Sequence, residues 1–308
     1  MQNSCSYKAI LIGNGTMGQR HRRLFEQDGV EFIGVADTFA EADSLFAKVV
    51  AGEICPDFAV VASPATTHDF FVKKVVELGL PALVEKPVMV SADDVAGCRD
   101  LALDRNAFIF VGHSERYNPA IEEFVGTDFF RELKRHFTDD NPGQDESAPV
   151  TFKFVRTHGF SERNRDVPVT LDLMVHDMDL LHFFADRKKL SFRSLDCTEF
   201  TEDRVYASFD FGAAKAEFVA DRRCARDCRT VEISMDGRSV LLDLGAYRNG
   251  NPAHALQKEH RAFLNCLNEF KKSKNEKNEW DWRVLFEDAC SAVTMVSLVG
   301  EKFRGKDK

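Results

Sequence analysis

The chain has 308 residues, enough for two domains with separate cores. Its hydrophobic fraction of 44% and charged fraction of 30% are typical of a soluble globular protein. The formal charge of −9 disfavours general binding to nucleic acids and membrane surfaces, because both are anionic.

The sequence also indicates a compartment. No apolar run reaches the roughly 18 residues of a membrane-spanning helix. The N-terminal segment MQNSCSYKAILIGNG lacks the pattern of a secretory signal. The eight cysteines are scattered, which favours reduced thiols in a cytoplasmic protein. Cys224 and Cys228 are spaced as C-x3-C without a matching second pair, so we expect no metal site there.

The first half of the chain alternates short apolar runs with stretches of helical periodicity. This regular alternation predicts a parallel, doubly wound sheet. Thr67 and Ser91 stand where they could cap two of the helices. The expected strands are 7–13, 31–37, 57–63, 81–87 and 107–113, and the expected helices are 17–29, 40–50, 67–80 and 91–105.

The segment 13-GNGTMG-18 has the G-x-G-x-x-G pattern, and it lies between the first expected strand and the first expected helix. In a dinucleotide-binding turn, Gly13 permits the tight turn, Gly15 lets the backbone approach a pyrophosphate, and Gly18 lets helix and strand pack closely. Asp37 ends the next expected strand, where a carboxylate can bind the adenosine ribose hydroxyls. The alternative is a glycine turn in an α/β domain without a ligand.

Asp37 also favours NAD over NADP, because a carboxylate would repel a 2′-phosphate. The residues that follow, 38-TFAE-41, contain no base to receive that phosphate. Ser63, Pro64 and His68 follow the third strand and would lie on the adenosine side of the dinucleotide. The full set of expected cofactor-binding residues is Gly13, Gly15, Thr16, Met17, Gly18, Asp37, Ser63, Pro64, His68, Glu85 and Lys86.

The stretch 83-LVEKPV-88 places Glu85 and Lys86 at the end of the fourth expected strand. Ligands of doubly wound sheets bind outside the carboxyl ends of the strands. A lysine at that position can donate hydrogen bonds to a reacting oxygen. The alternative is a surface pair of little energetic consequence.

The second half has a different pattern, typical of an antiparallel sheet with helices on one side. Several of its strand-like runs are separated by hairpin turns such as Asp236-Gly237. We expect a Rossmann domain over 1–119 and an α+β domain for substrate binding and oligomerisation over 120–308, whose last helix could pack back on the first domain. The expected strands are 151–160, 189–195, 203–212, 214–222, 229–237 and 238–245, with helices at 170–185, about 256–272 and 283–300.

The helix expected at 170–185 carries ionisable residues among apolar ones. Asp172, His176 and Asp179 lie at i, i+4 and i+7, on one stripe. An aspartate one turn before a histidine can orient its ring, and such a pair can act as general base for a hydroxyl. One alternative is a structural histidine whose hydrogen bonds are satisfied at a domain interface. The other is a zinc site formed by Asp172, His176 and His182. Asp179 is expected to be structural or to pair with a base such as Arg116.

These motifs together resemble the glucose–fructose oxidoreductase / inositol dehydrogenase (Gfo/Idh/MocA) family, and the resemblance covers essentially the whole chain. It implies that Lys86, Asp172 and His176 are catalytic and act with NAD(P) on a substrate hydroxyl or carbonyl. The stretches 111-VGHSERYNPAI-121 and 171-LDLMVHDMDL-180 are most similar to the branch that acts on UDP-N-acetylglucosamine at its 3-hydroxyl.

The resulting hypothesis is an NAD-dependent dehydrogenase of a sugar, sugar nucleotide or cyclitol. The alternatives are a reductase of a tetrapyrrole or dihydrodiol, and a nicotinamide-sensing regulator without turnover. We expect a homodimer or homotetramer joined through the second sheet, because strands 203–212 and 214–222 carry apolar residues on more than one face. The expected substrate-binding residues are Arg116, Asn118, Arg156, Asp172 and His176.

Overall fold

The computed structural model describes residues 7–138, 148–159, 166–246, 254–272 and 281–306. The chain forms two compact units. One comprises Met1–Gly112 with Leu256–Cys290, and the other comprises His113–Ala255 with Ser291–Lys308. The division into domains at residue 119 stays a prediction.

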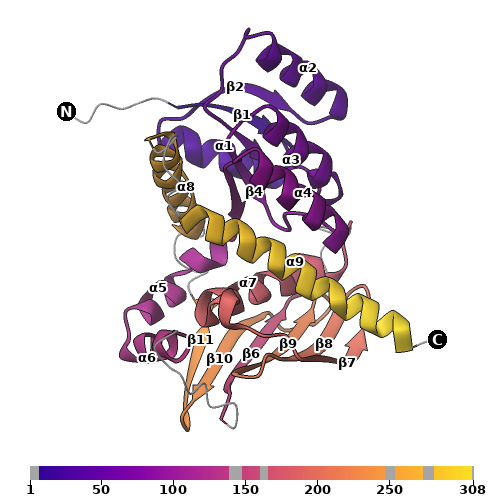
Figure 1. Ribbon diagram of the computed structural model, residues 1–308, viewed down its shortest axis with the longest axis vertical. Coiled ribbons are helices and arrows are strands. Elements are labelled where there is room, and N and C mark those ends of the chain that lie inside the picture. The colour runs from indigo at the N-terminus through magenta and orange to yellow at the C-terminus, as the bar shows by residue number, and fades with distance from the viewer. Residues whose placement is uncertain (1–6, 139–147, 160–165, 247–253, 273–280, 307–308) are drawn as a thin grey trace. The chain divides into compact units, whose positions relative to one another are not determined.

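The first unit contains the predicted parallel sheet, with strand order β2-β1-β3-β4-β5 (Figure 1). All four pairs of neighbouring strands are parallel, which confirms the doubly wound prediction. Every residue of β3, the central strand, is buried, as expected for a strand with both faces covered, and so is every residue of the edge strand β5. The strands are β1 Lys8–Ile12, β2 Glu31–Ala36, β3 Phe58–Val61, β4 Ala82–Glu85 and β5 Ile109–Gly112.

Helices pack on this sheet through aromatic side chains. On α8, which lies late in the sequence, Phe263 contacts Phe25 of α1 and Phe58 of β3. A segment distant in sequence therefore completes the core of the first unit, and Figure 1 shows α8 beside α1. The helices of this unit are α1 Thr16–Gln27, α2 Phe39–Val50, α3 His68–Glu77, α4 Ala92–Asp104 and α8 His254–Lys272.

The two predicted caps have different outcomes. The Ser91 hydroxyl accepts the backbone N–H of Asp94 and caps α4, as predicted. Thr67 stands at the N-cap position of α3 as predicted, but its side chain makes no capping hydrogen bond, because the residue also ends a 3-10 turn, Ala65–Thr67. The Thr67 hydroxyl instead donates to the carbonyl of Pro64 and fixes the loop after β3.

The second unit contains a six-stranded sheet in the order β11-β10-β6-β9-β8-β7. Only β6 and β9 pair in parallel among its described strands, so the prediction of a mostly antiparallel sheet is confirmed. Phe160, the last residue of one predicted strand, lies outside the described residues. The strands are β6 Val150–Thr157, β7 Ser194–Phe200, β8 Arg204–Asp210, β9 Ala214–Asp221, β10 Cys228–Met235 and β11 Arg238–Asp243.

The strand predicted at 189–195 is wrong in position, since β7 begins only at Ser194. Arg187–Lys189 form a 3-10 turn instead. Asp186 starts this turn with a positive φ of 54°, and its carboxylate accepts the backbone N–H of Lys188. Local hydrogen bonding of an aspartate therefore overrides the strand pattern there.

Helices lie along one face of this sheet, with α7 crossing it in Figure 1. The other face is more polar than the sequence suggested. In β8 and β9 the exposed positions alternate with buried ones, and Tyr206 is their exposed aromatic residue. On this face of the two strands, apolar side chains are confined to Tyr206 and its cross-strand neighbour Val219, so the expectation of apolar residues on both faces holds only for this pair. The helices are α5 Pro119–Val125, α6 Asp128–His136, α7 Val175–Ala185 and α9 Asp281–Lys306, which begins in the first unit.

Two features of the described residues concern membrane helices and cysteines. None of their helices is long and apolar enough to cross a membrane. The seven cysteines within the described part of the chain are free thiols.

Candidate active site

The glycine turn after β1 has the geometry of a dinucleotide-binding loop. Gly13 has a φ of +94°, and a Cβ there would lie 2.4 Å from the backbone nitrogen of Ser63. A Cβ on Gly18 would lie 1.9 Å from the carbonyl oxygen of Gly13. The chain's own packing therefore requires glycine at both positions. A Cβ on Gly15 would meet nothing within 4 Å, so the fold leaves space where an NAD pyrophosphate has to approach.

The first turn of α1 suits an anion. Gly15 is its N-cap, no side chain caps the free N–H groups, and the first turn holds no acidic residue. Thr16 is exposed and Met17 is partly exposed beside it. The exposed Asp37 contacts this turn, since its Oδ1 accepts the Asn14 N–H at 2.6 Å. These residues fit NAD, whose phosphates would lie on the helix N-terminus.

The E-K-P segment follows β4 at the same edge of the sheet. His68 links it to the loop after β3, because its Nδ1 lies 2.8 Å from the Pro87 carbonyl and its Nε2 lies 3.0 Å from the Ser63 carbonyl. Carbonyl oxygens only accept hydrogen bonds, so both ring nitrogens of His68 act as donors in this arrangement. Lys86 is half-buried, and the Lys86-Pro87 peptide bond is cis. The structure thus brings Gly13, Ser63, His68 and Lys86 to one edge.

Glu85 points away from solvent at the end of β4. Its Oε1 lies 2.7 Å from His21 Nε2, and its Oε2 accepts the backbone N–H of Lys86. Burial raises the pKa of Glu85, but the His21 hydrogen bond and the charges of His21, Lys86 and His68 outweigh it and hold the pKa below its usual range. Glu85 is therefore an ionised carboxylate beneath Lys86.

In the second unit, the helix predicted at 170–185 begins with a π-helical turn, Thr170–Met174, and continues as α7. Such turns are rare and often occur at functional sites. Asp172 is buried in this turn, with Arg222 Nη1 3.7 Å from its Oδ2. His176 is the one partly exposed residue in Val169–His182, a stretch that the structure describes in full. A partly exposed imidazole in an otherwise buried stretch is suited to contact a ligand.

Asp179 forms the predicted pair with Arg116. The Arg116 guanidinium donates from Nε and Nη2 to the two carboxylate oxygens, at 2.8 and 2.7 Å. His113 Nδ1 lies 3.6 Å from Asp179, and the His113 ring lies edge-on to the His176 ring at 6.5 Å. Burial raises the pKa of Asp179, but Arg116 and His113 outweigh it and lower the pKa. Asp179 is thus an ionised anchor between Arg116 and His113.

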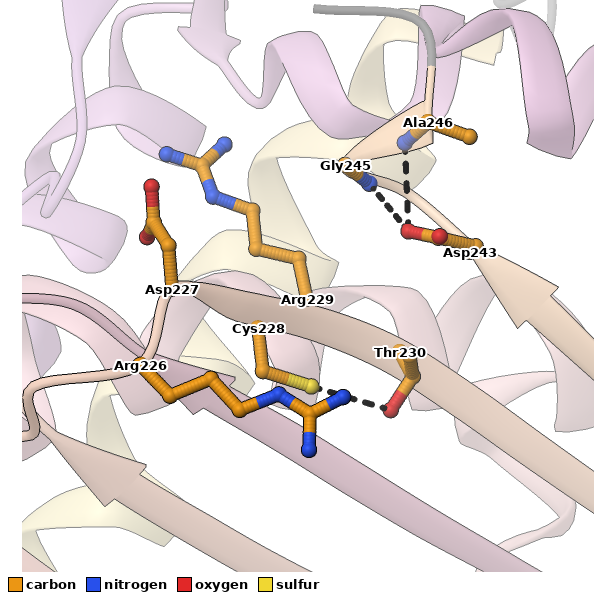
Figure 2. A pocket seen from close by; sticks show the side chains of 8 residues that line it. All are labelled: Arg226, Asp227, Cys228, Arg229, Thr230, Asp243, Gly245 and Ala246. Carbon is orange, nitrogen blue, oxygen red and sulfur yellow. Dashed lines mark hydrogen bonds between the residues drawn. The ribbon is translucent and has the colours of Figure 1, made fainter.

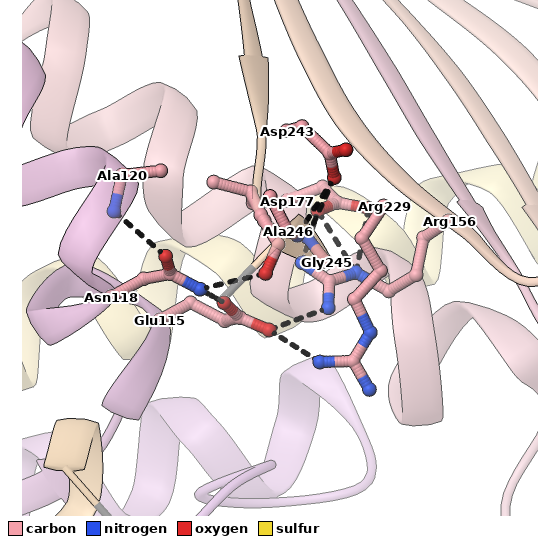
Figure 3. A network of polar contacts seen from close by, with 10 residues as sticks. Glu115, Asn118, Ala120, Arg156, Asp177, Arg229, Asp243, Gly245 and Ala246 are labelled. Atoms are coloured by element: carbon pink, nitrogen blue, oxygen red, sulfur yellow. Dashed lines mark hydrogen bonds and ion pairs between the residues drawn. The ribbon is translucent and has the colours of Figure 1, made fainter. Parts of the chain in front are cut away.

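A buried network of charges surrounds Arg156 (Figure 3). Its Nε and Nη2 donate to Asp177, and its Nη1 donates to Glu115 at 2.8 Å. Glu115 also accepts from Arg229 and from the amide of Asn118. Burial lowers the pKa of Arg156, but Asp177 and Glu115 outweigh it and raise the pKa, so the guanidinium stays charged.

The partly exposed Arg229 connects this network to a cavity of about 380 Å³ (Figure 2). Two arginines, two aspartates and small polar groups give the cavity both hydrogen-bond donors and acceptors. Asp243 accepts the backbone N–H groups of Gly245 and Ala246 and so shapes one wall. The lining residues are Arg226, Asp227, Cys228, Arg229, Thr230, Asp243, Gly245 and Ala246.

Three residues of this site, His113, Glu115 and Asp177, were not predicted from the sequence. His113 and Glu115 directly follow the fifth strand, so their position at a carboxyl end was an available signal. Asp177 follows His176, but the stripe of Asp172, His176 and Asp179 gave no reason to select it. No sequence signal linked Glu115 to Arg229, which is 114 residues away.

Comparison with known proteins agrees with this architecture. Residues 7–113 match the model of an oxidoreductase family with an NAD-binding Rossmann fold, GFO_IDH_MocA. Residues 7–113 thus have the NAD-binding Rossmann fold of the Gfo/Idh/MocA oxidoreductase family. This confirms the resemblance on which the sequence hypothesis was built.

Individual relatives are distant. UDP-N-acetylglucosamine 3-dehydrogenase of Acidithiobacillus ferrooxidans is 24% identical over 207 residues, 62% of this chain and 58% of the relative. Inositol 2-dehydrogenase of Rhizobium meliloti is 22% identical over 192 residues, 59% of this chain and 56% of the relative. Both matches thus span less than two thirds of the relative's own length.

A solved structure of UDP-N-acetylglucosamine 3-dehydrogenase GnnA from Acidithiobacillus ferrooxidans shares the fold. It aligns with a TM-score of 0.70 and 19% identity, over 96% of this chain and 97% of that chain. At that identity, the likeness establishes the architecture of both units.

Proposed function

We propose that the protein is an NAD-dependent dehydrogenase that oxidises a CH–OH group of a sugar, a sugar nucleotide or a cyclitol. The observation that carries this proposal is the accessible His176 in a buried helix that also holds Asp172. Lys86 directly follows β4 in the unit that has the NAD-binding fold. Relatives that act on UDP-N-acetylglucosamine and inositol support the substrate class.

In this proposal the substrate hydroxyl loses a proton to His176, while hydride leaves the same carbon. NAD, when bound, supplies the nicotinamide that takes up the hydride. Lys86 donates a hydrogen bond to the oxygen as negative charge develops on it, which lowers the barrier electrostatically. Asp172 orients the helix turn that carries His176 through its contact with Arg222. Asp37, exposed beside the glycine turn, favours NAD over NADP.

We further propose that the cavity beside Arg229 receives substrate hydroxyls, since its mixture of donors and acceptors suits a polyol. Arg116, Asn118 and Arg156 stay predicted substrate-binding residues. Arg116 binds Asp179, Asn118 binds Glu115 and Arg156 binds Asp177. We therefore propose that these three residues support substrate binding indirectly, by holding Arg229 and α7 in place. The free thiols support the proposal of a reducing, cytoplasmic compartment.

The test follows NADH absorbance after UDP-sugars, free sugars and inositols are added one at a time to protein supplied with NAD. We expect a rise with one class, because only a fitting substrate places its hydroxyl at His176. His176→Ala should lower kcat by roughly 10²-fold or more, the usual contribution of a general base. NAD affinity should stay within error, because His176 lies outside the NAD-binding fold.

The matched control is His254→Ala, since His254 is partly exposed and its Nε2 lies 3.8 Å from Glu122. This variant should keep wild-type turnover. Unchanged turnover in His176→Ala would remove His176 from the mechanism. NAD binding without turnover on any class would favour a sensor or a reductase of a non-sugar.

A further inference from the structure

Three ionisable side chains form a buried hydrogen-bonded chain that ends at the E-K-P segment. His260 Nε2 on α8 lies 2.7 Å from His21 Nδ1 on α1, and His21 Nε2 lies 2.7 Å from Glu85 Oε1. Both histidines are fully buried, and the Glu85 side chain is 12% exposed. The second Glu85 oxygen accepts the Lys86 N–H. This hydrogen-bonded chain thus connects α8 to the backbone of Lys86.

Hydrogen-bond chemistry fixes the direction of this chain. An ionised carboxylate can only accept, so His21 Nε2 carries a proton and donates it to Glu85. Burial lowers the pKa of His260 to about 2, with a smaller contribution from His21, so His260 is neutral. Neutral His260 either donates to or accepts from His21 Nδ1. In both arrangements His21 keeps its Nε2 proton on Glu85.

The ring of His260 is held by packing as well as by this contact. It stacks on Phe25 with ring centroids 3.7 Å apart and an interplanar angle of 1°. Phe25 lies one turn after His21 on α1. Helix α8 therefore presents His260 to His21 in a fixed orientation.

The groups that face Glu85 come from several elements. Lys86 follows it directly, and the charge of His68 on α3 also lowers the pKa of Glu85. Glu259 on α8 is buried, and its Oε1 lies 3.6 Å from the Cβ position of Gly112, the residue paired with Glu85 in the sheet. Without His21, Glu85 would lose a donor while Glu259 stayed near, so the pKa of Glu85 should rise.

We propose that His21 and His260 are positioning residues that keep Glu85 ionised and thereby hold the backbone of Lys86 for its action on the substrate oxygen. The proposal rests on the proposed function, since the role of Lys86 belongs to it. A protonated Glu85 would lose its charge-assisted hydrogen bond from His21 and its attraction to Lys86. Lys86 would then be less well placed, and turnover would fall with acidification.

The experiment compares four variants of the full-length protein. His21→Leu removes the hydrogen bonds, His21→Gln restores an N–H donor near the Nε2 position, and His260→Phe keeps a flat ring on Phe25. Phe263→Leu is the matched control, because it changes a buried ring on α8 that is not part of the hydrogen-bonded chain. Histidine-selective ¹⁵N NMR without substrate reports tautomers, and the pH profile of kcat is measured with NAD and the substrate that turns over.

We expect NMR to show protonated Nε2 at His21 and a neutral His260 down to pH 4. Protonation of the general base His176 already lowers kcat toward acid pH, so protonation of Glu85 should appear as a further steepening of the acid limb. In His21→Leu this steepening should begin about one pH unit higher, with a smaller shift in His260→Phe. His21→Gln should recover most of the shift, and Phe263→Leu should keep the wild-type profile. If His21→Leu does not fold, His260→Phe and His21→Gln carry the test.

Two results would overturn the proposal. One is a wild-type pH profile in His21→Leu or, should that variant not fold, in His260→Phe. The other is an NMR spectrum with the His21 Nε2 unprotonated. Absence of turnover with every substrate class is a separate failure, which removes the proposed function and the assigned role of Lys86. The NMR result would then still decide whether the hydrogen-bonded chain exists.

Discussion

Asp37 is the residue at which we predict that this chain selects between two nicotinamide cofactors. It is exposed at the end of β2, and one of its carboxylate oxygens accepts the Asn14 N–H in the glycine turn. That contact fixes the carboxylate beside the place where an adenosine ribose would lie. Hydrogen bonds to a charged group contribute about 1.5–3 kcal/mol, so this one side chain can decide cofactor preference.

Replacing Asp37 by alanine should weaken NAD binding by roughly 10- to 100-fold, the equivalent of that energy. NADP binding should improve, because the repulsion of its 2′-phosphate is removed. Fluorescence titration with each cofactor measures both changes. Asp43→Ala removes the same charge from an exposed position on α2 and should change neither affinity. Equal NAD affinity in Asp37→Ala would show that Asp37 does not contact the ribose.

At the scale of elements, α7 depends on a buried charge network that ties it to β6 and β10. Arg156 on β6 binds Asp177 on α7 and Glu115 after β5, and Glu115 in turn binds Arg229 on β10. Buried ion pairs add little over a well-packed apolar core, but removal of one member leaves uncompensated charge. The network therefore fixes where α7 lies on the sheet more than it adds net stability.

Arg156→Met should destabilise the protein by about 3–5 kcal/mol, because Glu115 and Asp177 would stay buried without their cation. Urea unfolding followed by circular dichroism measures this loss. Arg131→Met is the control in the same unit. Its ion pair with Asp128 is largely exposed and should be worth about 0–1 kcal/mol. A loss below about 1 kcal/mol in Arg156→Met would mean that water or rearrangement compensates the two acids.

The elements differ in how far the sequence could predict them. The strands and glycines of the first unit follow from local pattern, because apolar runs, turn residues and the spacing of Gly13, Gly15 and Gly18 are all short-range signals. The misplaced β7 shows the limit, since the turn at Asp186 depends on one side-chain hydrogen bond.

The candidate site was predictable only in part. Lys86, Asp172 and His176 were selected by motif. His21 and His260 were not, because 239 residues separate them and their contact exists only after α8 packs on α1. The network of Glu115, Arg156 and Arg229 arises in the same way. It forms only when β6 and β10, which are far apart in sequence, pair in the sheet. Tertiary contacts of this kind leave no local periodicity to detect.

At the scale of the whole molecule, one face of the second sheet has no helix on it in Figure 1. Its exposed residues are mostly polar and form complementary cross-strand pairs, such as Lys153 of β6 with Glu217 and Glu232 of the adjacent strands. Tyr206, 36% exposed, adds an aromatic side chain, a type enriched at the centres of interfaces. A two-fold interface made of this face would bury a sheet that otherwise faces water.

We therefore expect a homodimer or homotetramer joined through this sheet, and light scattering at micromolar concentration measures the mass directly. Tyr206→Asp should shift the protein toward the monomer, because it places a charge where an aromatic contact would be buried. Val50→Asp is the matched control, since Val50 is 73% exposed on α2 of the first unit. A monomeric wild-type protein would contradict the expectation. An oligomer insensitive to Tyr206→Asp would place the interface on another surface, because a polar sheet face can stay solvated without a partner.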